Sequence, residues 1–210
     1  MPTFQVMTDL FVRSGPGTEF DTLDTLEQGD VIEGISTVGW MPILMEDGSI
    51  GWVSKKFLTE PSVLAPDPVV STGEPIWITW ARKHLGQKEI SGPASNPVIE
   101  AWYHLTTLPK YMWTDSTAWC AVFVNAAFML NNIKGLRSAD AEAWKNFGTK
   151  SDTPKKGDVV VFEWDNSQHH VAFFLRDLGN GRIEVIGGNQ SDTVTIENYP
   201  VSNVLAYRRV

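Results

Sequence analysis

The chain has 210 residues, of which 42% are hydrophobic and 20% charged, as is typical of a globular protein with a substantial core. Its formal net charge of −8 is unevenly distributed, because residues 1–60 carry 10 acidic and 3 basic side chains whereas residues 61–210 carry 15 and 14. This asymmetry indicates two domains and argues against nucleic acid as a partner of either. A single cysteine excludes an internal disulfide framework.

The N-terminal residues lack the basic segment and apolar run that mark a secretory leader. No apolar run approaches the ~18 residues that a membrane span needs. We therefore expect a monomer without a membrane span that is synthesised in the cytoplasm. No motif indicates a metal site, and we expect no cofactor.

Residues 4–58 read as short strands separated by turns rich in Gly, Pro, Asp and Ser. The expected strands are residues 4–12, 31–38, 40–45 and 49–53. Several short strands without a helical period predict a small all-β barrel.

Four segments of this region resemble a bacterial SH3 domain and occur in the family's order. They are residues 12–17 (VRSGPG), 26–30 (LEQGD), 39–40 (GW) and 47–54 (DGSIGWVS). Phe11 departs from the pattern, since the family often has Asn there. The resemblance implies a module that anchors an enzyme to cell-wall peptides, with Trp40 as a candidate contact. At least one of Trp40 and Trp52 is expected to be core.

Residues 61–74 hold three prolines and no periodic pattern, which predicts a semi-rigid linker. The expected organisation is therefore a first domain at 1–60, this linker, and a second domain at 75–210. In the second domain, helical spacing and capping residues come first and strand patterns follow, which predicts an α+β fold. Expected helices cover residues 75–85, 96–105, the segment from Cys120 and 138–147, and expected strands cover 158–164, 170–176, 182–187, 193–197 and 204–208.

Cys120 follows a cluster of helix-capping residues, so we expect it in the first turn of an apolar helix. There the free backbone N–H groups and the helix dipole lower the pKa of a thiol. A lone cysteine is otherwise most often a small buried hydrophobic residue. Its role therefore depends on which residues lie near it.

The turn at residues 178–181 contains Asn-Gly, which favours a tight hairpin. If residue 177 pairs with 182, then His170 faces Asn189 on the adjacent strand. A cysteine at a helix start, a histidine and an amide form the set needed for thiol catalysis.

Four blocks of the second domain resemble the cysteine peptidase superfamily of CHAP and NlpC-type cell-wall hydrolases. They are residues 117–121 (TAWCA), 156–162 (KGDVVVF), 170–173 (HVAF) and 187–190 (GGNQ). The resemblance implies a papain-like domain with helices packed on an antiparallel sheet.

Carried over from the family, Cys120 matches the nucleophile, His170 the base and Asn189 the polar third member. Gln190 competes with Asn189 for the third role. Trp119, Gln190 and Trp40 are weaker candidates for substrate contact.

The expected activity is hydrolysis of peptidoglycan amide bonds, at the stem peptide or crossbridge, by an endopeptidase or an N-acetylmuramoyl-L-alanine amidase. The alternatives are an inactive wall-binding protein and an acyltransferase on the same scaffold. Without a leader, the protein would reach the wall as a phage endolysin released by lysis or as an injected effector. An effector would have an immunity protein as a partner.

Overall fold

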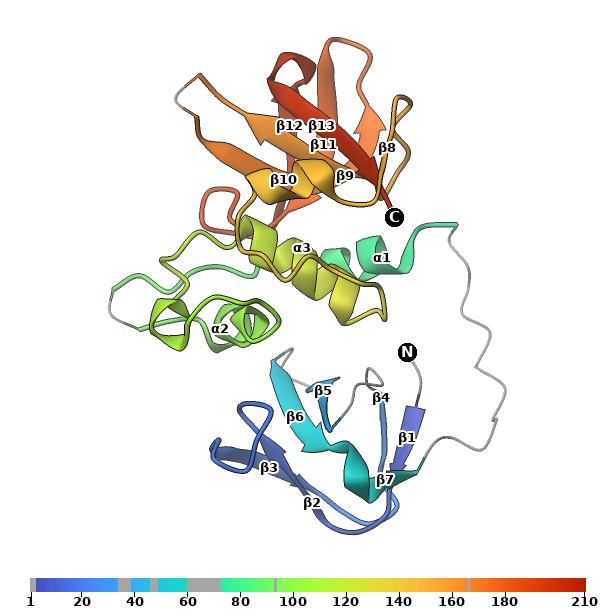
Figure 1. Cartoon of the computed structure of the whole chain (residues 1–210), viewed down its shortest axis with the longest axis vertical. Helices are drawn as coiled ribbons and strands as arrows, with labels where there is room; N and C mark the ends of the chain where they lie inside the picture. Colours follow the sequence, from blue (N-terminus) through green and yellow to red (C-terminus); the bar gives the residue numbers. More distant parts are fainter. Residues whose placement is uncertain (1–2, 34–38, 46–48, 60–72, 93, 166) are drawn as a thin grey trace. The chain divides into compact units, whose positions relative to one another are not determined.

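The computed structural model describes residues 3–33, 39–45, 49–59, 73–92, 94–165 and 167–210 (Figure 1). The chain divides into two compact units, one built mainly from residues up to 72 and the other mainly from residues 73 onward. The predicted linker lies almost entirely outside the described residues, and the predicted domain bounds remain a prediction. Among the described helices, none has the length and apolar character required to cross a membrane.

The first unit consists of short antiparallel strands in two sheets, ordered β4-β1-β7 and β3-β2-β6-β5. The strands are β1 Thr3–Val6, β2 Leu10–Arg13, β3 Thr22–Leu26, β4 Val31–Glu33, β5 Trp40–Leu44, β6 Ile50–Ser54 and β7 Leu58–Thr59. Alternate residues face inward and form the core, as a period of two requires. This core contains Phe4, Val6, Leu10, Val12, Met41, Ile43 and Val53.

The small strand-rich unit confirms the fold predicted for the N-terminal region. The continuous strand predicted over residues 4–12 is wrong, because β1 ends at Val6 and β2 begins at Leu10. Part of the strand predicted over 31–38 falls outside the described residues. Trp52 is buried, as expected for at least one of the two tryptophans, and Trp40 is partly exposed.

In the described part of the second unit, the helices α1 Ile76–Lys83, α2 Pro97–Tyr103 and α3 Cys120–Met129 precede the sheet. Asn96 caps α2, since its side-chain oxygen accepts a hydrogen bond from Val98 N at 2.9 Å and Pro97 occupies the first helical position. α3 is buried on all sides from Cys120 to Phe128, which is why its sequence is apolar without a polar face.

The helix predicted over residues 138–147 is wrong, because only the 3₁₀ turn η3 (Glu142–Asn146) forms there. The Asn125 side chain accounts for the start of this segment. Its Nδ2 donates to Ser138 O at 2.8 Å, and its Oδ1 accepts from Arg137 N at 2.7 Å. A buried side chain thus supplies bonds that helical neighbours would otherwise make.

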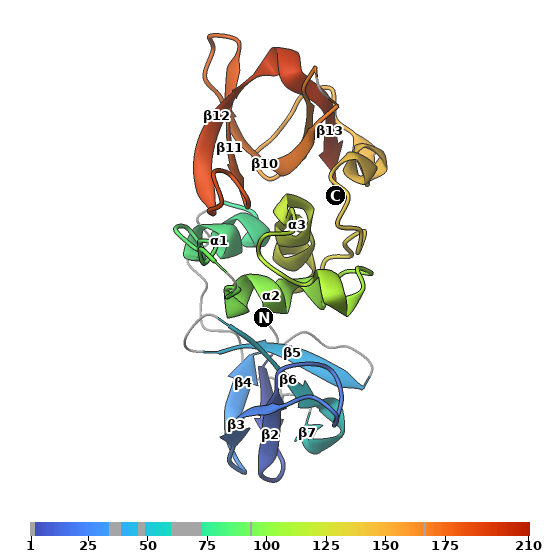
Figure 2. The same cartoon turned by 90° about the vertical axis from the view of Figure 1, so that its left-hand side faces the viewer.

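The sheet of the second unit has six antiparallel strands in the order β12-β11-β10-β9-β13-β8. They are β8 Thr149–Lys150, β9 Val159–Glu163, β10 His169–Asp177, β11 Arg182–Gly187, β12 Thr195–Pro200 and β13 Val204–Arg209. The sheet is strongly curled, and α3 lies between it and α2 (Figure 2). Edge-to-face contacts hold α3 in place: Phe128 on Phe173 of β10 and Phe123 on Trp102 of α2. The predicted α+β class, with helices packed on an antiparallel sheet, is confirmed.

The pairing of β10 with β11 differs between its two ends. Phe173 pairs with Ile186, which is the predicted register, but Asp177 pairs with Ile183 instead of residue 182. A bulge between Phe174 and Arg176 accounts for the shift of one residue. The prediction was therefore wrong about the turn and right toward the end that carries His170.

Candidate functional site

Cys120 is the first residue of α3, as the sequence predicted. The opening hydrogen bond of this helix runs from Phe123 N to Trp119 O at 2.9 Å. The Cys120 side chain is 6% exposed and lines a pocket of about 710 Å³. Its thiol therefore lies at a helix N-terminus and also borders an open cavity.

The expectation that the helix start lowers the pKa of Cys120 is wrong for the resting site. Burial raises the pKa of this thiol, and it outweighs the opposing hydrogen bonds to the backbone at Val171, Ala121 and Cys120 itself. The resting thiol is therefore protonated, and a reaction needs a base that removes its proton.

His170, at the start of β10, borders the same pocket and is 8% exposed. Its Nε2 lies 3.2 Å from Oε1 of Gln190. The Gln190 amide is oriented by Thr195, because its Nε2 donates to Thr195 O at 2.7 Å and to Thr195 Oγ1 at 3.1 Å. The oxygen of this amide therefore faces His170, so His170 Nε2 carries the proton and Nδ1 is the free base.

Burial lowers the pKa of His170 to about 4, although the hydrogen bond with Gln190 acts in the opposite direction. Three aromatic rings surround the imidazole, with centroids 6.1 Å (Phe162), 6.5 Å (Trp164) and 5.9 Å (Tyr199) from it. The imidazole is therefore neutral at pH 7 and can accept a proton.

Two glycines before Gln190 make room for this arrangement. A Cβ on Gly187 would lie 2.9 Å from Ala172 Cβ and 3.0 Å from Gln190 Oε1. A Cβ on Gly188 would lie 2.5 Å from Trp119 Cζ3 and 2.7 Å from Phe123 Cβ. Both positions require glycine because of close packing, since neither has a positive φ.

The structure separates the two candidates for the third role. Asn189 lines the pocket, but it has φ +56° in the left-handed region and is not the residue hydrogen-bonded to His170. Since β11 ends at Gly187, strand alternation stops before Asn189, and the side chain of Gln190 reaches the imidazole. Geometry favours Gln190 over the predicted Asn189.

His169 also borders the pocket, but its Nε2 lies 3.4 Å from Glu163 Oε1. Adjacent strand residues point to opposite faces, which separates the two imidazoles.

Trp119 and Trp40 do not line the pocket. Trp119 is fully buried and donates from Nε1 to Glu89 Oε1 at 2.8 Å, so its predicted contact with substrate is wrong. Trp40 belongs to the first unit, where it pairs with Ser54.

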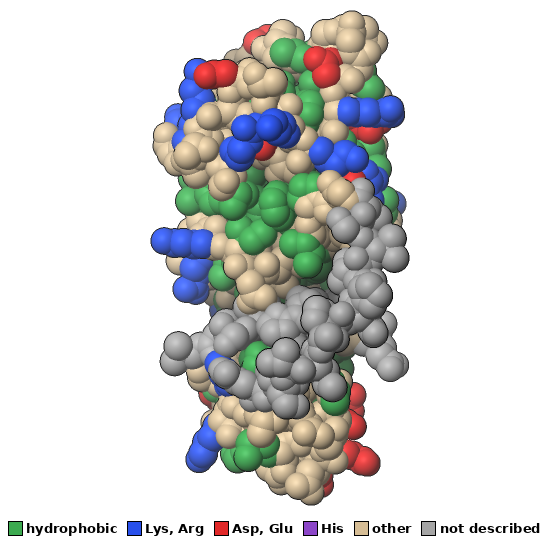
Figure 3. Space-filling view, turned by 90° about the vertical axis from the view of Figure 1, so that its right-hand side faces the viewer, with side chains coloured by type: hydrophobic (Ala, Val, Ile, Leu, Met, Phe, Trp, Pro, Cys, Tyr) green, Lys and Arg blue, Asp and Glu red, His purple; other side chains and the backbone are tan. Residues whose placement is uncertain are grey.

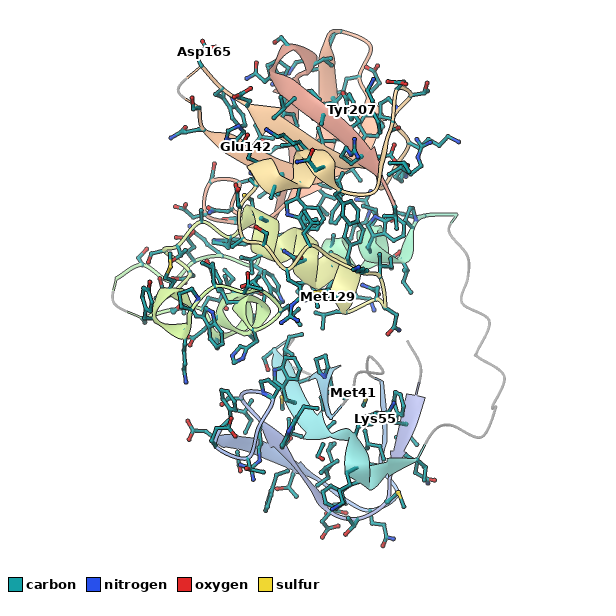
Figure 4. All side chains as sticks on the ribbon, viewed as in Figure 1. Met41, Lys55, Met129, Glu142, Asp165 and Tyr207 are labelled. Atoms are coloured by element: carbon teal, nitrogen blue, oxygen red, sulfur yellow. The ribbon has the colours of Figure 1, made fainter. Side chains whose placement is uncertain are left out.

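The sequence analysis missed Trp164, Tyr199 and Asp165, which complete the wall of the pocket. No sequence pattern connects Tyr199 with His170, because the curl of the sheet brings them together. Asp165 lies on the loop after β9 (Figure 4). The lining is Ala118, Cys120, Trp164, Asp165, Gln168, His169, His170, Asn189, Gln190, Ser191 and Tyr199.

None of the described residues that line the pocket is a lysine or arginine. On the face of the second unit seen in Figure 3, lysine and arginine side chains gather instead. Several cations of this unit form ion pairs away from the pocket, such as Arg209 with Asp158 (2.7 Å) and Lys156 with Glu74 (3.2 Å). In the part of the chain that the structure describes, no group of three or more His, Cys, Asp or Glu is arranged to hold a metal ion.

Two family models match the chain. The bacterial SH3 domain matches residues 8–59, and the CHAP domain matches residues 112–189, which include Cys120, His170 and Asn189. Gln190 is the residue directly after the second match.

Solved structures of NlpC-type proteins are similar at low identity. An NlpC/P60 family protein from Bacillus cereus has 16% identity and a TM-score of 0.42, with 99% of this chain and 63% of that chain covered. NlpC1 from Trichomonas vaginalis has 18% identity and a TM-score of 0.38 (99% and 68% covered), and NlpC2 from the same organism has 16% and 0.37 (99% and 72%). The chain thus spans less than two thirds of the Bacillus protein. No curated protein matches it.

Proposed function

Since this chain carries a bacterial SH3 domain followed by a CHAP domain, we propose that it hydrolyses amide bonds of peptidoglycan with Cys120 as the nucleophile. One observation supports this proposal most strongly. Cys120, at the start of a buried helix, and a His170 imidazole oriented by Gln190 line one open pocket.

In the proposed reaction, His170 Nδ1 removes the thiol proton as the sulfur attacks the substrate carbonyl carbon. The negative charge on the carbonyl oxygen is stabilised by backbone N–H groups at the start of α3. His170 then protonates the leaving amine, which departs as the thioester forms. Water, activated by His170, hydrolyses the thioester and restores the thiol.

Gln190 has an orienting role in this scheme. Its carbonyl oxygen accepts the Nε2 proton of His170, which keeps Nδ1 free for the thiol. A neutral amide does not fix a positive charge on the imidazole as strongly as a carboxylate. The proposed site therefore rests as a neutral thiol and a neutral imidazole, in agreement with the pKa directions of both groups.

Purified sacculi digested with wild type, Cys120→Ala and Cys120→Ser test the proposal. Mass spectrometry of the products distinguishes an amidase, which releases the whole stem peptide from the sugar, from an endopeptidase, which creates new ends within peptides. We expect both variants to lose about 10³-fold or more of the activity while keeping the wild-type circular dichroism. Full activity in Cys120→Ala would refute Cys120 as the nucleophile, whereas an inactive wild type would favour the alternative of a wall-binding protein without catalysis. Added amine acceptors that outcompete water would identify the acyltransferase alternative.

We further propose that the SH3 domain holds the enzyme on the wall. Because residues 1–60 carry 10 acidic and 3 basic side chains, attraction to anionic wall polymers is not the expected source of binding. We expect aromatic and shape contacts that include Trp40, and only modest weakening by salt. Sedimentation of the Cys120→Ala protein with sacculi across a salt series tests this. Trp40→Ala should reduce binding, whereas Tyr111→Ala, an exposed aromatic outside this domain, should not.

The route to the wall remains the prediction made from the sequence. Phage release is the preferred route, and delivery as an effector with an immunity protein is its alternative. The genes next to this one distinguish the two, because an effector gene would adjoin one for an immunity protein.

A further inference from the structure

Glu89, in the segment between α1 and α2, contacts both parts of the framework around the pocket. Its Oε1 accepts a hydrogen bond from Trp119 Nε1 at 2.8 Å. Its backbone N donates to Asp192 O at 3.0 Å. Trp119 directly precedes Cys120, and Asp192 follows Gln190 by two residues. One residue therefore bonds to the nucleophile segment and to the loop that orients His170.

The backbone of this segment is held independently of the Glu89 side chain. Gly86 N donates to Val194 O at 2.9 Å, and Val194 N donates to Gln87 O at 2.8 Å. Lys88 forms an isolated bridge with Thr193. A substitution that removes only the acceptor oxygen of the Glu89 side chain therefore leaves this backbone pairing in place and abolishes the bond to Trp119.

The indole of Trp119 transmits the position of Glu89 to the pocket. It is fully buried and packs on Trp102 with ring centroids 6.0 Å apart. Another part of the same ring lies against Gly188, where an added Cβ would come within 2.5 Å of Cζ3. Nε1 is the single polar atom of the ring and is the atom that Glu89 binds. This hydrogen bond therefore fixes the orientation of the Trp119 ring.

We propose that Glu89 is a positioning residue for the amide hydrolysis, because it holds the Trp119 indole against Gly188 and so fixes Cys120 relative to His170 and Gln190. This inference rests on the proposed function. A displacement of about 1 Å in a site of this kind costs up to ~10²-fold in rate. Side chains that support the reacting residues therefore affect the rate without touching the substrate.

The hydrogen bond rather than the negative charge performs this role. Burial raises the pKa of Glu89, the charges of Asp192 and Asp115 raise it further, and the bond from Trp119 opposes them. Nearby carboxylates make a negative charge unfavourable here, and a neutral amide oxygen also accepts an indole N–H. Glu89→Gln is therefore the conservative variant, and Glu89→Leu keeps the size but removes the acceptor.

The experiment measures kcat and KM on a soluble muropeptide, the alkylation rate of Cys120 by iodoacetamide, and Tm. For Glu89→Leu we expect kcat to fall about tenfold or more with little change in KM, and alkylation to slow by a similar factor. Glu89→Gln should stay within about threefold of wild type. Trp119→Phe, which removes the donor, should match Glu89→Leu, and the double variant should be no worse than either single variant.

Glu184→Leu is the matched control, since it removes a carboxylate that pairs with Arg176 at 2.8 Å on β10 and β11. It should leave kcat unchanged. The inference is overturned if Glu89→Leu lowers Tm but keeps wild-type kcat, because the bond would then only stabilise the fold. It is also overturned if Glu89→Gln is as slow as Glu89→Leu. An inactive wild type or an active Cys120→Ala would instead refute the proposed function itself.

Discussion

Both ends of the β10–β11 pair are antiparallel, but they differ in how their glycines are packed. The glycines at one end are closely surrounded by side chains, and those at the other end have open space beside them. At the end that carries His170, Gly187 and Gly188 have no space for a Cβ, and Gln190 is 2% exposed. At the hairpin end, Gly179 and Gly181 have φ +74° with no atom within 4 Å of an added Cβ. The pairing is also shifted by a bulge between Phe174 and Arg176.

The hairpin end and the pocket end thus require glycine for two different reasons. In the hairpin, glycine supplies a left-handed backbone that other residues adopt with strain. Beside the pocket, glycine supplies space, so that the Trp119 ring and the Gln190 side chain approach the backbone. A glycine in the first class affects local stability, whereas one in the second class affects the geometry of the proposed catalytic residues.

The largest effect is expected at the pocket end, from the imidazole. His170→Ala removes the base, and we expect a loss of about 10³-fold or more in kcat/KM. His169→Ala should lose much less, because this side chain contacts Glu163 instead. Both rates are measured on a soluble muropeptide. If His169→Ala proved the more harmful, the assignment of His170 as the base would be wrong.

A pair of glycine variants tests the packing difference directly. Gly188→Ala introduces a clash with Trp119, and we expect a destabilisation of about 1–3 kcal/mol together with lost activity. Gly181→Ala meets no atoms, so it should cost about 1 kcal/mol for the positive φ and keep full kcat. Denaturant unfolding and steady-state kinetics give both values. Equal kinetic losses in the two variants would remove the distinction between the two ends.

Variants of the neighbouring residues Gln190 and Asn189 test which amide orients the imidazole of His170. Gln190→Leu removes the acceptor of the His170 Nε2 proton, and we expect kcat/KM to fall about tenfold or more. Asn189→Ala should have a smaller effect, because Asn189 only lines the pocket. The reverse order would restore Asn189 to the role that the sequence predicted.

The smallest effect is expected from moderate acidification. Because burial lowers the pKa of His170 to about 4, the imidazole stays neutral as the pH falls from 7 to 5. The activity in kcat/KM should therefore decline only near pH 4, as His170 becomes protonated and loses its function as a base. A pH–rate profile on a soluble substrate measures this decline of kcat/KM at acidic pH. A midpoint near the ordinary value of 6.5 would mean that the imidazole is more hydrated than its burial indicates.

Much of the pocket end was predictable because its signals are local. Capping residues before Cys120 predicted a helix start there, and the hairpin turn at residues 178–181 predicted the pairing of Phe173 with Ile186, although not the pairing next to the turn itself. The choice between Asn189 and Gln190 was not predictable by strand alternation, because β11 ends at Gly187 and the backbone at Asn189 is left-handed.

Other features depend on contacts that are distant in the sequence. The pKa of the Cys120 thiol is raised because the thiol is itself buried, which its place at a helix start does not reveal. Tyr199 reaches the pocket through the curl of the sheet. The segment at 138–147 departs from a helix where Asn125 binds its backbone. In each case a tertiary contact overrides a correct local rule.

Titration with iodoacetamide tests the central claim most directly, because Cys120 is the only cysteine and every carbamidomethylated cysteine reports this site. Mass spectrometry of the peptide that contains Cys120 gives the fraction of this thiol alkylated, and release of muropeptides gives the remaining activity of the same sample. The account predicts that activity falls in proportion to alkylation and reaches zero at one group per chain. Undiminished hydrolysis by fully alkylated protein would contradict a thiol nucleophile.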